Sequence, residues 1–332
     1  MRRTRRRGGT AAAVALGVAA ALTLGGCGQG GGTADRGADR ARPARQATAT
    51  PATAPADDPN CVPPKSYRPA AGPLPRPGHM PAGSTMARIV KRGRLIASVD
   101  QNAYLMGYRN PLNGRLEGFD IDILHRISEA LFGDPGRIEY RTMSSGDRIA
   151  SLIKRDDPVD IVVHSMTINC ERWKQVAFST DYLDTGQRVL VPVDSPAKSI
   201  DDLAGKRVCA VRNTTSIDEL ARRPVIPVEA EQWTDCLMRM QIGTVDAVST
   251  DDNILYGLKA QDPTTKLIGK RFTDEPHGIA MRPAETDFVR FVNGVLDQMR
   301  ADGSWMALYR KYLAPEAGTD SVTAPPVAEY RD

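Results

Sequence analysis

The sequence lacks the residue patterns of several common enzyme classes. It has only four histidines in 332 residues, and they are scattered along the chain. No H-E-x-x-H motif is present, and no nucleophile elbow of the form G-x-S-x-G is present either. These absences argue against zincin-type metalloproteases and α/β-hydrolases. Carboxylates are abundant, so an exported small-molecule lyase or dehydratase stays open as an alternative function.

The chain also lacks a hydrophobic run long enough to cross a membrane. Five arginines within residues 2–7 precede an uncharged apolar run over residues 11–24, which is shorter than the roughly 20 residues a spanning helix needs. This pattern is typical of a secretory signal. The run ends in Gly25, Gly26 and Cys27, which resembles a bacterial lipobox. We therefore expect a lipoprotein signal peptide over residues 1–26 and a lipid on Cys27 that holds the protein at the outer face of the membrane. An ordinary cleaved signal, with Cys27 incidental, is the alternative.

Beyond the signal, the chain lacks a basic patch. The formal charge of +4 becomes −1 once the five signal-peptide arginines are removed, and the part from Met86 onward carries −4. A mildly acidic domain of this kind does not indicate nucleic-acid binding.

Two segments lack the large apolar residues that build a core. Residues 27–85 are rich in Pro, Ala, Gly and Thr, and residues 315–332 have a similar composition. We expect the first segment to be a flexible, lipidated tether and the second to be a flexible tail.

Four cysteines remain besides Cys27, and four cysteines allow three pairings. In an oxidising compartment they are expected to form disulfides. Cys209 lies in an expected strand and Cys236 in the helix that follows it, so these two are paired. Cys61 and Cys170 then form the second bond by elimination, which would join the end of the tether to the folded domain.

The remaining region alternates short β-type runs with helical ones, as in doubly wound α/β domains. About 230 residues make two lobes more plausible than one. Expected strands include residues 94–99, 159–163, 189–193, 206–211, 245–249 and 277–281, and expected helices include residues 288–299 and 304–312.

Several short stretches together carry a family resemblance. The chain is similar to the polar-amino-acid-binding proteins of ATP-driven uptake systems (extracellular solute-binding proteins, family 3), especially to glutamine- or glutamate-binding lipoproteins. The matching stretches occur in family order: GRLIASVDQNAY from Gly93, LEGFDIDI from Leu116, VDIVVHSMTINCERW from Val159, FSTDYLD from Phe178, DLAGKRV from Asp202, NTTS from Asn213 and VDAVSTDD from Val245.

The resemblance implies a two-lobe α/β fold of the periplasmic-binding-protein type II class, with two hinge strands. Residues 86–190 and 282–314 would form lobe 1, and residues 191–281 would form lobe 2. It further implies capture of an amino acid by lobe closure, without a cofactor or metal. The partner would be an ABC permease or a membrane sensor, and the protein is expected to be a monomer.

A zwitterion removed from water needs fixed partners for both charges. A guanidinium offers a carboxylate two parallel donors, and Arg172 follows a strand end at Ser165 to Thr167. Spacing alone favours a different reading, in which Arg172 is a surface arginine and Thr167 caps its helix. The resemblance implies that Thr167 and Arg172 bind the α-carboxylate.

In the second lobe, Thr214 and Thr215 follow a strand and precede a helix, where backbone N–H groups point at an anion. A plain helix cap is compatible with this role. Asp251, at the end of the next strand, would by resemblance pair with the α-ammonium. Asp252 and Asp246 are the other candidates for this role. The alternative for Asp252 is a helix cap, and Asp246 is expected to be structural.

The resemblance also places Asp100, Tyr104 and His164 around the ligand. A lone histidine next to an apolar strand, such as His164, is more often a satisfied core residue. A cationic or donor group there, assisted by Arg212, Arg141 or Arg109, would suit an acidic or amide side chain. This favours glutamate as the ligand, with glutamine, aspartate and asparagine next.

Overall fold

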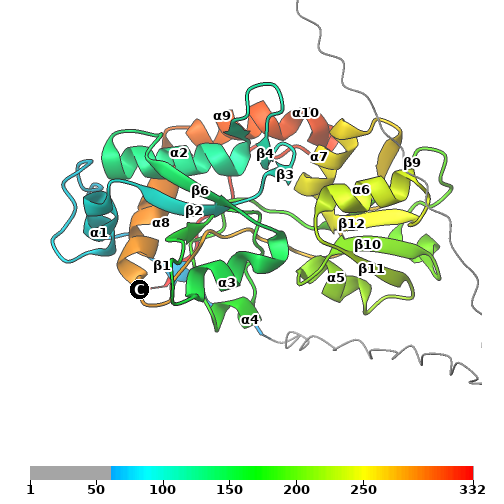
Figure 1. Ribbon diagram of the computed structural model, residues 1–332, viewed down its shortest axis with the longest axis horizontal. Helices are drawn as coiled ribbons and strands as arrows, with labels where there is room; N and C mark the ends of the chain where they lie inside the picture. The colour runs from blue at the N-terminus through cyan, green and yellow to red at the C-terminus, as the bar shows by residue number, and fades with distance from the viewer. Residues whose placement is uncertain (1–60, 332) are drawn as a thin grey trace, which may run out of the picture. The chain divides into compact units, whose positions relative to one another are not determined.

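The computed structural model describes residues 61–331, so the expected signal peptide and Cys27 lie outside the described part of the chain. Within that part, no helix combines the length and apolar character needed to cross a membrane. Two five-stranded sheets organise the structure (Figure 1). The first has the strand order β6 (Ile138–Thr142), β2 (Leu95–Val99), β7 (Ile161–Val162), β14 (Ala280–Met281) and β8 (Ala177–Phe178). The second has the order β11 (Ile226–Ala230), β10 (Arg207–Val211), β12 (Ala247–Asp251), β9 (Gln187–Pro192) and β13 (Thr265–Ile268).

The first sheet is buried on both faces, as β2 illustrates. Leu95, Ala97 and Val99 belong to one hydrophobic cluster, whereas Ile96 belongs to a second cluster. Successive side chains of a strand point to opposite faces, so this division means that both faces are covered. Strands β6, β2 and β7 are parallel, and β14 pairs antiparallel with both β7 and β8.

Helices cover this first sheet, and α2 begins at a position that only glycine fits. Gly118, the N-cap of α2, has φ 133°, and a Cβ there would lie 2.3 Å from the carbonyl oxygen of Met106. A small three-stranded sheet precedes it, formed by β3 (Asn102–Ala103), β4 (Gly107–Arg109) and β5 (Leu116–Glu117). The helices of this half are α1 (Thr85–Arg92), α2 (Phe119–Phe132), the 3-10 turn η1 (Ser145–Asp147), α3 (Arg148–Ile153), α4 (Cys170–Trp173), α8 (Thr286–Ala301) and α9 (Ser304–Tyr312).

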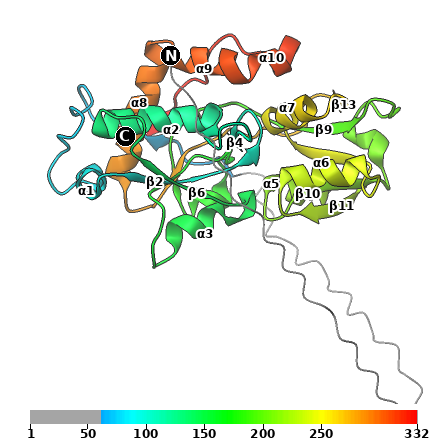
Figure 2. The same cartoon turned by 45° about the horizontal axis from the view of Figure 1, so that its top comes forward.

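The second sheet has its own core. Apolar residues of β9, β10 and β12 pack with helices α5 (Thr215–Leu220), α6 (Trp233–Gln241) and α7 (Asp252–Gln261) in a separate hydrophobic cluster. The 3-10 turn η2 (Ile200–Leu203) completes this half. The turned view in Figure 2 shows α6 and α7 with the strands of this sheet. The type II two-lobe α/β fold expected from the resemblance is therefore confirmed.

The chain crosses between the sheets twice. It leaves the first sheet after β8 and enters the second at β9, and it returns between β13 and β14. Thus residues 187–190 lie in the second sheet and residues 280–281 in the first, a few residues away from the boundaries expected at 190 and 281. The expected boundaries fell inside β9 and β14, because the sheet that a residue joins is set by strand pairing between distant segments, which hydrophobicity along the chain does not reveal.

The two segments expected to be flexible are partly folded. Residues 66–67 form β1 and pair in parallel with β15 (Tyr330–Arg331), near the end of the expected tail. The tail also contains α10 (Ala314–Ala317) and the 3-10 turn η3 (Gly318–Asp320). The prediction of a loose tail is therefore wrong, and the expected tether is folded where it forms β1, whereas its residues 27–60 lie outside the described part of the chain. The Pro- and Ala-rich composition of both segments gave no indication of the few residues in them that pack onto the folded domain.

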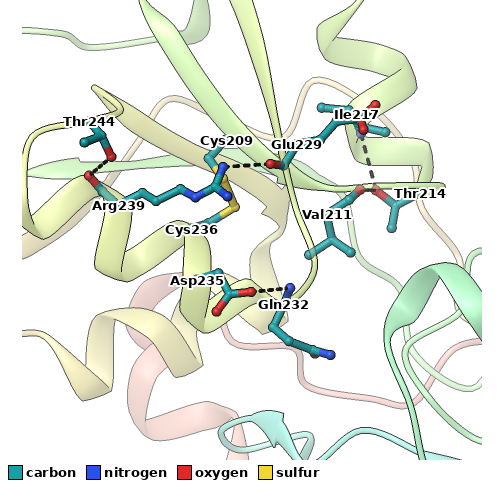
Figure 3. The surroundings of a disulfide bond; sticks show 10 residues. All are labelled: Cys209, Val211, Thr214, Ile217, Glu229, Gln232, Asp235, Cys236, Arg239 and Thr244. Carbon is teal, nitrogen blue, oxygen red and sulfur yellow. Dashed lines mark hydrogen bonds between the residues drawn. A yellow bond between two sulfur atoms is a disulfide. The ribbon is translucent and has the colours of Figure 1, made fainter. Parts of the chain in front are cut away.

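Both disulfides expected from the sequence are present in the structure. Cys209 of β10 and Cys236 of α6 are joined inside the second lobe, with a Cα–Cα distance of 5.5 Å (Figure 3). Cys61 is joined to Cys170 over a sequence separation of 109 residues. The second bond attaches the segment before β1 to helix α4.

Candidate functional site

Arg172 and Thr167 lie together at the edge of the first lobe. Arg172 belongs to α4 and is buried, and its Nη1 donates to the carbonyl oxygen of Thr167 over 2.8 Å. The Asn169 side chain caps α4 by accepting from the Arg172 backbone N–H at 2.9 Å. The helix cap therefore comes from Asn169 rather than Thr167, which leaves the Thr167 hydroxyl free of that task.

Thr215 of the second lobe meets Thr167 of the first. Their hydroxyl oxygens are 3.4 Å apart, and Thr215 Oγ1 donates to Glu275 Oε2 over 3.0 Å. Thr214 has a different role, because its hydroxyl accepts from the Ile217 N–H and donates to the Val211 carbonyl, as Figure 3 shows. Thr214 is the helix cap, and Thr215 is the threonine that faces the other lobe.

A cavity of about 670 Å³ contains these groups in its wall. Thr167 and Arg172 contribute from the first lobe, Thr215 from the second, and Glu275 from the return crossing. The turn before α5 also reaches it through Asn213, whose φ of 56° is one that asparagine tolerates better than most residues. The structure thus brings three of the expected carboxylate-binding residues to one cavity.

Asp251 ends β12 and is buried between the lobes. Its Oδ2 lies 3.0 Å from Nε2 of His277, whereas its Oδ1 has no hydrogen-bond partner among the described residues. Burial raises the pKa of Asp251 to about 7, and repulsion from Asp252 adds to the rise. Arg148 and Arg172 act in the opposite direction, so both guanidinium groups lie within electrostatic range of this carboxylate.

The competitors of Asp251 have structural roles. Asp252 forms an ion pair with Arg271, whose Nε donates to Asp252 Oδ2 over 2.6 Å. Asp246 accepts from the backbone N–H of Arg207 at 2.8 Å. Neither contact crosses to the first lobe's binding residues.

Asp100 and His164 form a buried pair in the first lobe, 2.9 Å apart from Oδ2 to Nε2. Burial opposes ionisation of Asp100, but His164 and two backbone N–H groups outweigh it, and the pKa of Asp100 is lowered. Burial also lowers the pKa of His164, against the pull of Asp100. His164 is therefore neutral near pH 7, and its unpartnered Nδ1 is an acceptor rather than a cation.

Ser165 is held by a second buried carboxylate. Its backbone N–H and hydroxyl both donate to Asp120 Oδ2, at 2.9 and 3.2 Å, and Tyr182 donates to the other oxygen at 2.8 Å. Ser165 has a positive φ of 44°, and this network fixes it there. Burial raises the pKa of Asp120 to about 6, although Tyr182 and Ser165 oppose the rise. Ser165 shapes the strand end from which Thr167 projects.

Two expected residues lie apart from this group. Arg212 pairs with Glu231 at 2.5 Å and approaches Asp147 of the first lobe at 3.7 Å, so it bridges the lobes at their rim. The Tyr104 ring packs edge-on against Tyr108, with centroids 4.7 Å apart. Arg141 and Arg109, the other two arginines expected to assist, have different partners. Arg141 forms ion pairs with Asp157 and Glu139. Arg109 donates to the Gln101 side chain and to the Gly114 carbonyl.

Sequence reasoning missed Arg148, which is buried at the start of α3. Its Nε donates to the Ser145 carbonyl, and its Nη1 donates to the carbonyls of His164 and Ser165 at 2.8 and 2.7 Å. Burial and the nearby Arg172 lower the pKa of Arg148 to about 9, whereas Asp251 and Asp100 raise it. The available signal was its helical spacing, because Arg148, Ser151 and Leu152 share the buried face of α3.

Glu275 and His277 were also missed. Both are buried on the return crossing, and alternate residues of an extended segment share a face. Burial raises the pKa of Glu275, and Asp251 adds to the rise. No clear signal marked them, because the segment before β14 contains several other polar and charged residues.

Comparisons with known proteins find a family model, sequence relatives and similar structures. The family model of bacterial extracellular solute-binding proteins, family 3, matches residues 95–315. The ABC transporter glutamine-binding protein GlnH of Bacillus subtilis is 35% identical over 232 residues, which cover 69% of this chain and 84% of GlnH. The glutamate-binding protein GluB of Corynebacterium glutamicum is 28% identical and covers 74% of this chain and 85% of GluB. Holo ArgBP from T. maritima is similar in structure, with a TM-score of 0.61, 29% identity, and coverage of 68% of this chain and 98% of ArgBP.

Proposed function

Because the chain belongs to the bacterial extracellular solute-binding proteins of family 3, and is an amino-acid-binding protein of the ABC-transporter type rather than an enzyme, we propose that it captures glutamate between its lobes. Glutamine, aspartate and asparagine are the next candidates. The ligand would be bound as a zwitterion, with both backbone charges paired inside the closed site.

The observation that carries this proposal is that groups of opposite charge lie within electrostatic range of one another between the lobes. Arg172, Thr167 and Thr215 offer a guanidinium and two hydroxyls for the α-carboxylate. Buried Asp251 offers an oxygen without a partner for the α-ammonium, within the field of Arg172. A carboxylate and an ammonium on one carbon fit this arrangement, since each finds a charge of opposite sign.

The groups next to these residues indicate which side chain the ligand carries. Arg148 is a buried guanidinium in the field of Asp100 and Asp251, and it supports an acidic side chain. His164, in contrast, is neutral and has an accepting Nδ1, which suits the amide N–H of glutamine. Glutamine is therefore the second candidate, and the name of the Bacillus relative supports it as well.

The membrane part of the proposal rests on the sequence. A lipid on Cys27 would hold the protein at the outer face of the membrane, and the tether would let the lobes reach a permease or a membrane sensor. Closure would then present a different surface to that partner, because the ligand stabilises the closed state.

A binding screen tests the ligand. The purified chain, without its signal peptide, is titrated calorimetrically with each of the twenty common amino acids. We expect glutamate to bind most tightly, near 1 μM, which corresponds to about −8 kcal/mol. Binding of only Lys, Arg or His would contradict the acidic-or-amide assignment, and no binding of any amino acid would contradict the proposed function.

A further inference from the structure

Helix α4, which carries Arg172, is too short to hold its own position. It consists of only four residues, Cys170–Trp173. A single helical turn is not stable by itself in water, because nucleation fixes several residues for few hydrogen bonds. The side-chain cap from Asn169 satisfies one N–H, but the placement of the turn must come from outside it.

One outside attachment is the disulfide to Cys61. Cys170 is two residues from Arg172, and its Cα lies 6.4 Å from that of Cys61. The chain that follows Cys61 continues along the site, because Pro63 lines the same cavity as Thr167, Arg172 and Thr215. The segment that leads in from the tether is therefore part of the cavity wall. We call residues 61–68 the N-terminal arm.

A second attachment joins α4 to the arm through the C-terminal tail. The Arg331 guanidinium lies 5.1 Å from the centre of the Trp173 ring and 4.2 Å from that of Tyr67. Trp173 belongs to α4, Tyr67 belongs to the arm, and Arg331 belongs to β15. The cation thus connects all three segments between two aromatic faces.

The arm itself is fixed to the first lobe. Ser66 is buried, and its hydroxyl donates to the carbonyl of Phe178 in β8 over 2.7 Å. The Asn293 amide of α8 donates to Ser66 Oγ and to the Tyr67 carbonyl, both at 2.7 Å. A rigidly held arm can transmit its position to α4.

Both attachments involve residues outside the range that the family model matches. That range is residues 95–315, whereas Cys61, Tyr67 and Arg331 lie outside it.

We infer that the N-terminal arm is a working part of the amino-acid site, and that the Cys61–Cys170 disulfide positions Arg172 for the ligand's α-carboxylate. This inference rests on the proposed function, since it takes Arg172 as the carboxylate-binding group. Ligand affinity is then coupled to the segment that connects the domain to its anchor.

The test compares the two disulfides of the chain. C61S/C170S and C209S/C236S variants are titrated calorimetrically with L-glutamate and L-glutamine, at a temperature where circular dichroism shows both to be folded. We expect the first variant to bind roughly tenfold more weakly than the wild type. The second variant is the matched control, because its bond lies inside the second lobe, and its affinity should change less than twofold.

Two further measurements separate positioning from general loosening. The C61S/C170S substitution should weaken binding much less in an R172K background, because the two changes act on the same contact. It should also have little effect on glutamic acid α-amide, which has no α-carboxylate for Arg172. Equal losses in both backgrounds and for both ligands would overturn the positioning role.

The outcomes distinguish the two proposals. If the wild type binds neither amino acid, the proposed function fails. If the wild type binds and R172K weakens binding, but C61S/C170S binds like the wild type, only the present inference fails. If C61S/C170S does not fold, R331A gives the same test with every cysteine in place, and unchanged affinity in R331A would overturn the inference.

Discussion

Nε2 of His277 lies 3.0 Å from Oδ2 of Asp251, at the place where the return crossing meets the second sheet. Burial lowers the pKa of His277 to about 4, so the ring is neutral near pH 7. Its Nδ1 has no hydrogen-bond partner among residues 61–331, and a carboxylate only accepts, so the hydrogen is on Nε2. Thr185 Oγ1, on the outward crossing, lies 3.1 Å from the same nitrogen. The Asp251 carboxylate, the proposed partner of the ligand's ammonium, is therefore oriented by both crossings, while its other oxygen has no hydrogen-bond partner in the described part of the chain.

Replacing Asp251 with Asn should remove the partner of the ligand's ammonium. We expect D251N to weaken amino-acid binding by about 2–5 kcal/mol, the range for truncating one partner of a buried charge pair. Calorimetric titration measures the change. D246N is the control, because Asp246 is partly exposed and its carboxylate accepts from the backbone N–H of Arg207 in its own lobe. Similar losses in both variants would argue against the assigned role.

The same residue should make the ligand-free protein less stable at higher pH. Asp251 has a folded pKa of about 7 against an ordinary value of 3.8, so between these values the folded state binds more protons than the unfolded state. Stability from this group is therefore present at low pH and is lost as pH rises through about 7. We expect D251N to raise the melting temperature of the ligand-free protein at pH 8 by several degrees, and to have little effect at pH 4. A drop at pH 8 would contradict the assignment.

Gly257 of α7 should control lobe closure. A Cβ at this position would lie 2.1 Å from the carbonyl oxygen of Tyr104, which belongs to the first lobe. Alanine in a helix is otherwise favourable by about 0.5–1 kcal/mol. We expect G257A to keep or raise the melting temperature while it weakens ligand binding, because the methyl group keeps the lobes apart.

G294A provides the comparison for this experiment. Gly294 is also helical, but its Cβ would meet the flexible end of Leu74 rather than the opposite lobe. Its affinity should stay within a factor of about two of the wild type, whatever it does to stability. Small-angle X-ray scattering with saturating ligand would report whether G257A still closes.

Arg148 should set the preference between an acid and an amide. We expect R148Q to weaken glutamate binding by about 1–3 kcal/mol more than glutamine binding, because a buried guanidinium recognises the carboxylate. The measurement is the ratio of the two affinities. Loss of the hydrogen bonds from Arg148 to three backbone carbonyls lowers the stability of the protein, and this effect is the same whichever ligand is bound. R109Q, which changes an exposed arginine, should leave the ratio unchanged.

The fold was largely predictable because apolar periodicity is a local signal. The helix expected over residues 304–312 is the observed α9, and the strand expected over 206–211 is β10 from Arg207. Thr167, Arg172 and Asp251 could be named because each follows a strand in a stretch that resembles the family. The lobe boundaries at the crossings were less predictable, since they depend on which strands pair, and pairing joins segments that are distant in sequence.

Side-chain partners were not predictable, because they come from other segments of the chain. Arg212 and Arg148 look alike in the sequence, yet Arg212 is drawn to Glu231 at the rim and Arg148 is buried beside Asp251. Thr214 and Thr215 are adjacent, yet one caps its helix and the other faces Glu275. Partners more than 60 positions away in sequence, such as Asp100 for His164, have no local signature.

The sequence by itself determined the α/β alternation, the family, the placement of the cysteines and the residue types that can bind a zwitterion, because these follow from local pattern and composition. Only the tertiary structure decided that His277 orients Asp251, that Arg148 belongs to the site, and that the arm and the tail meet at α4. Those relationships depend on which distant segments pack together and exclude water, and burial then sets their charge states.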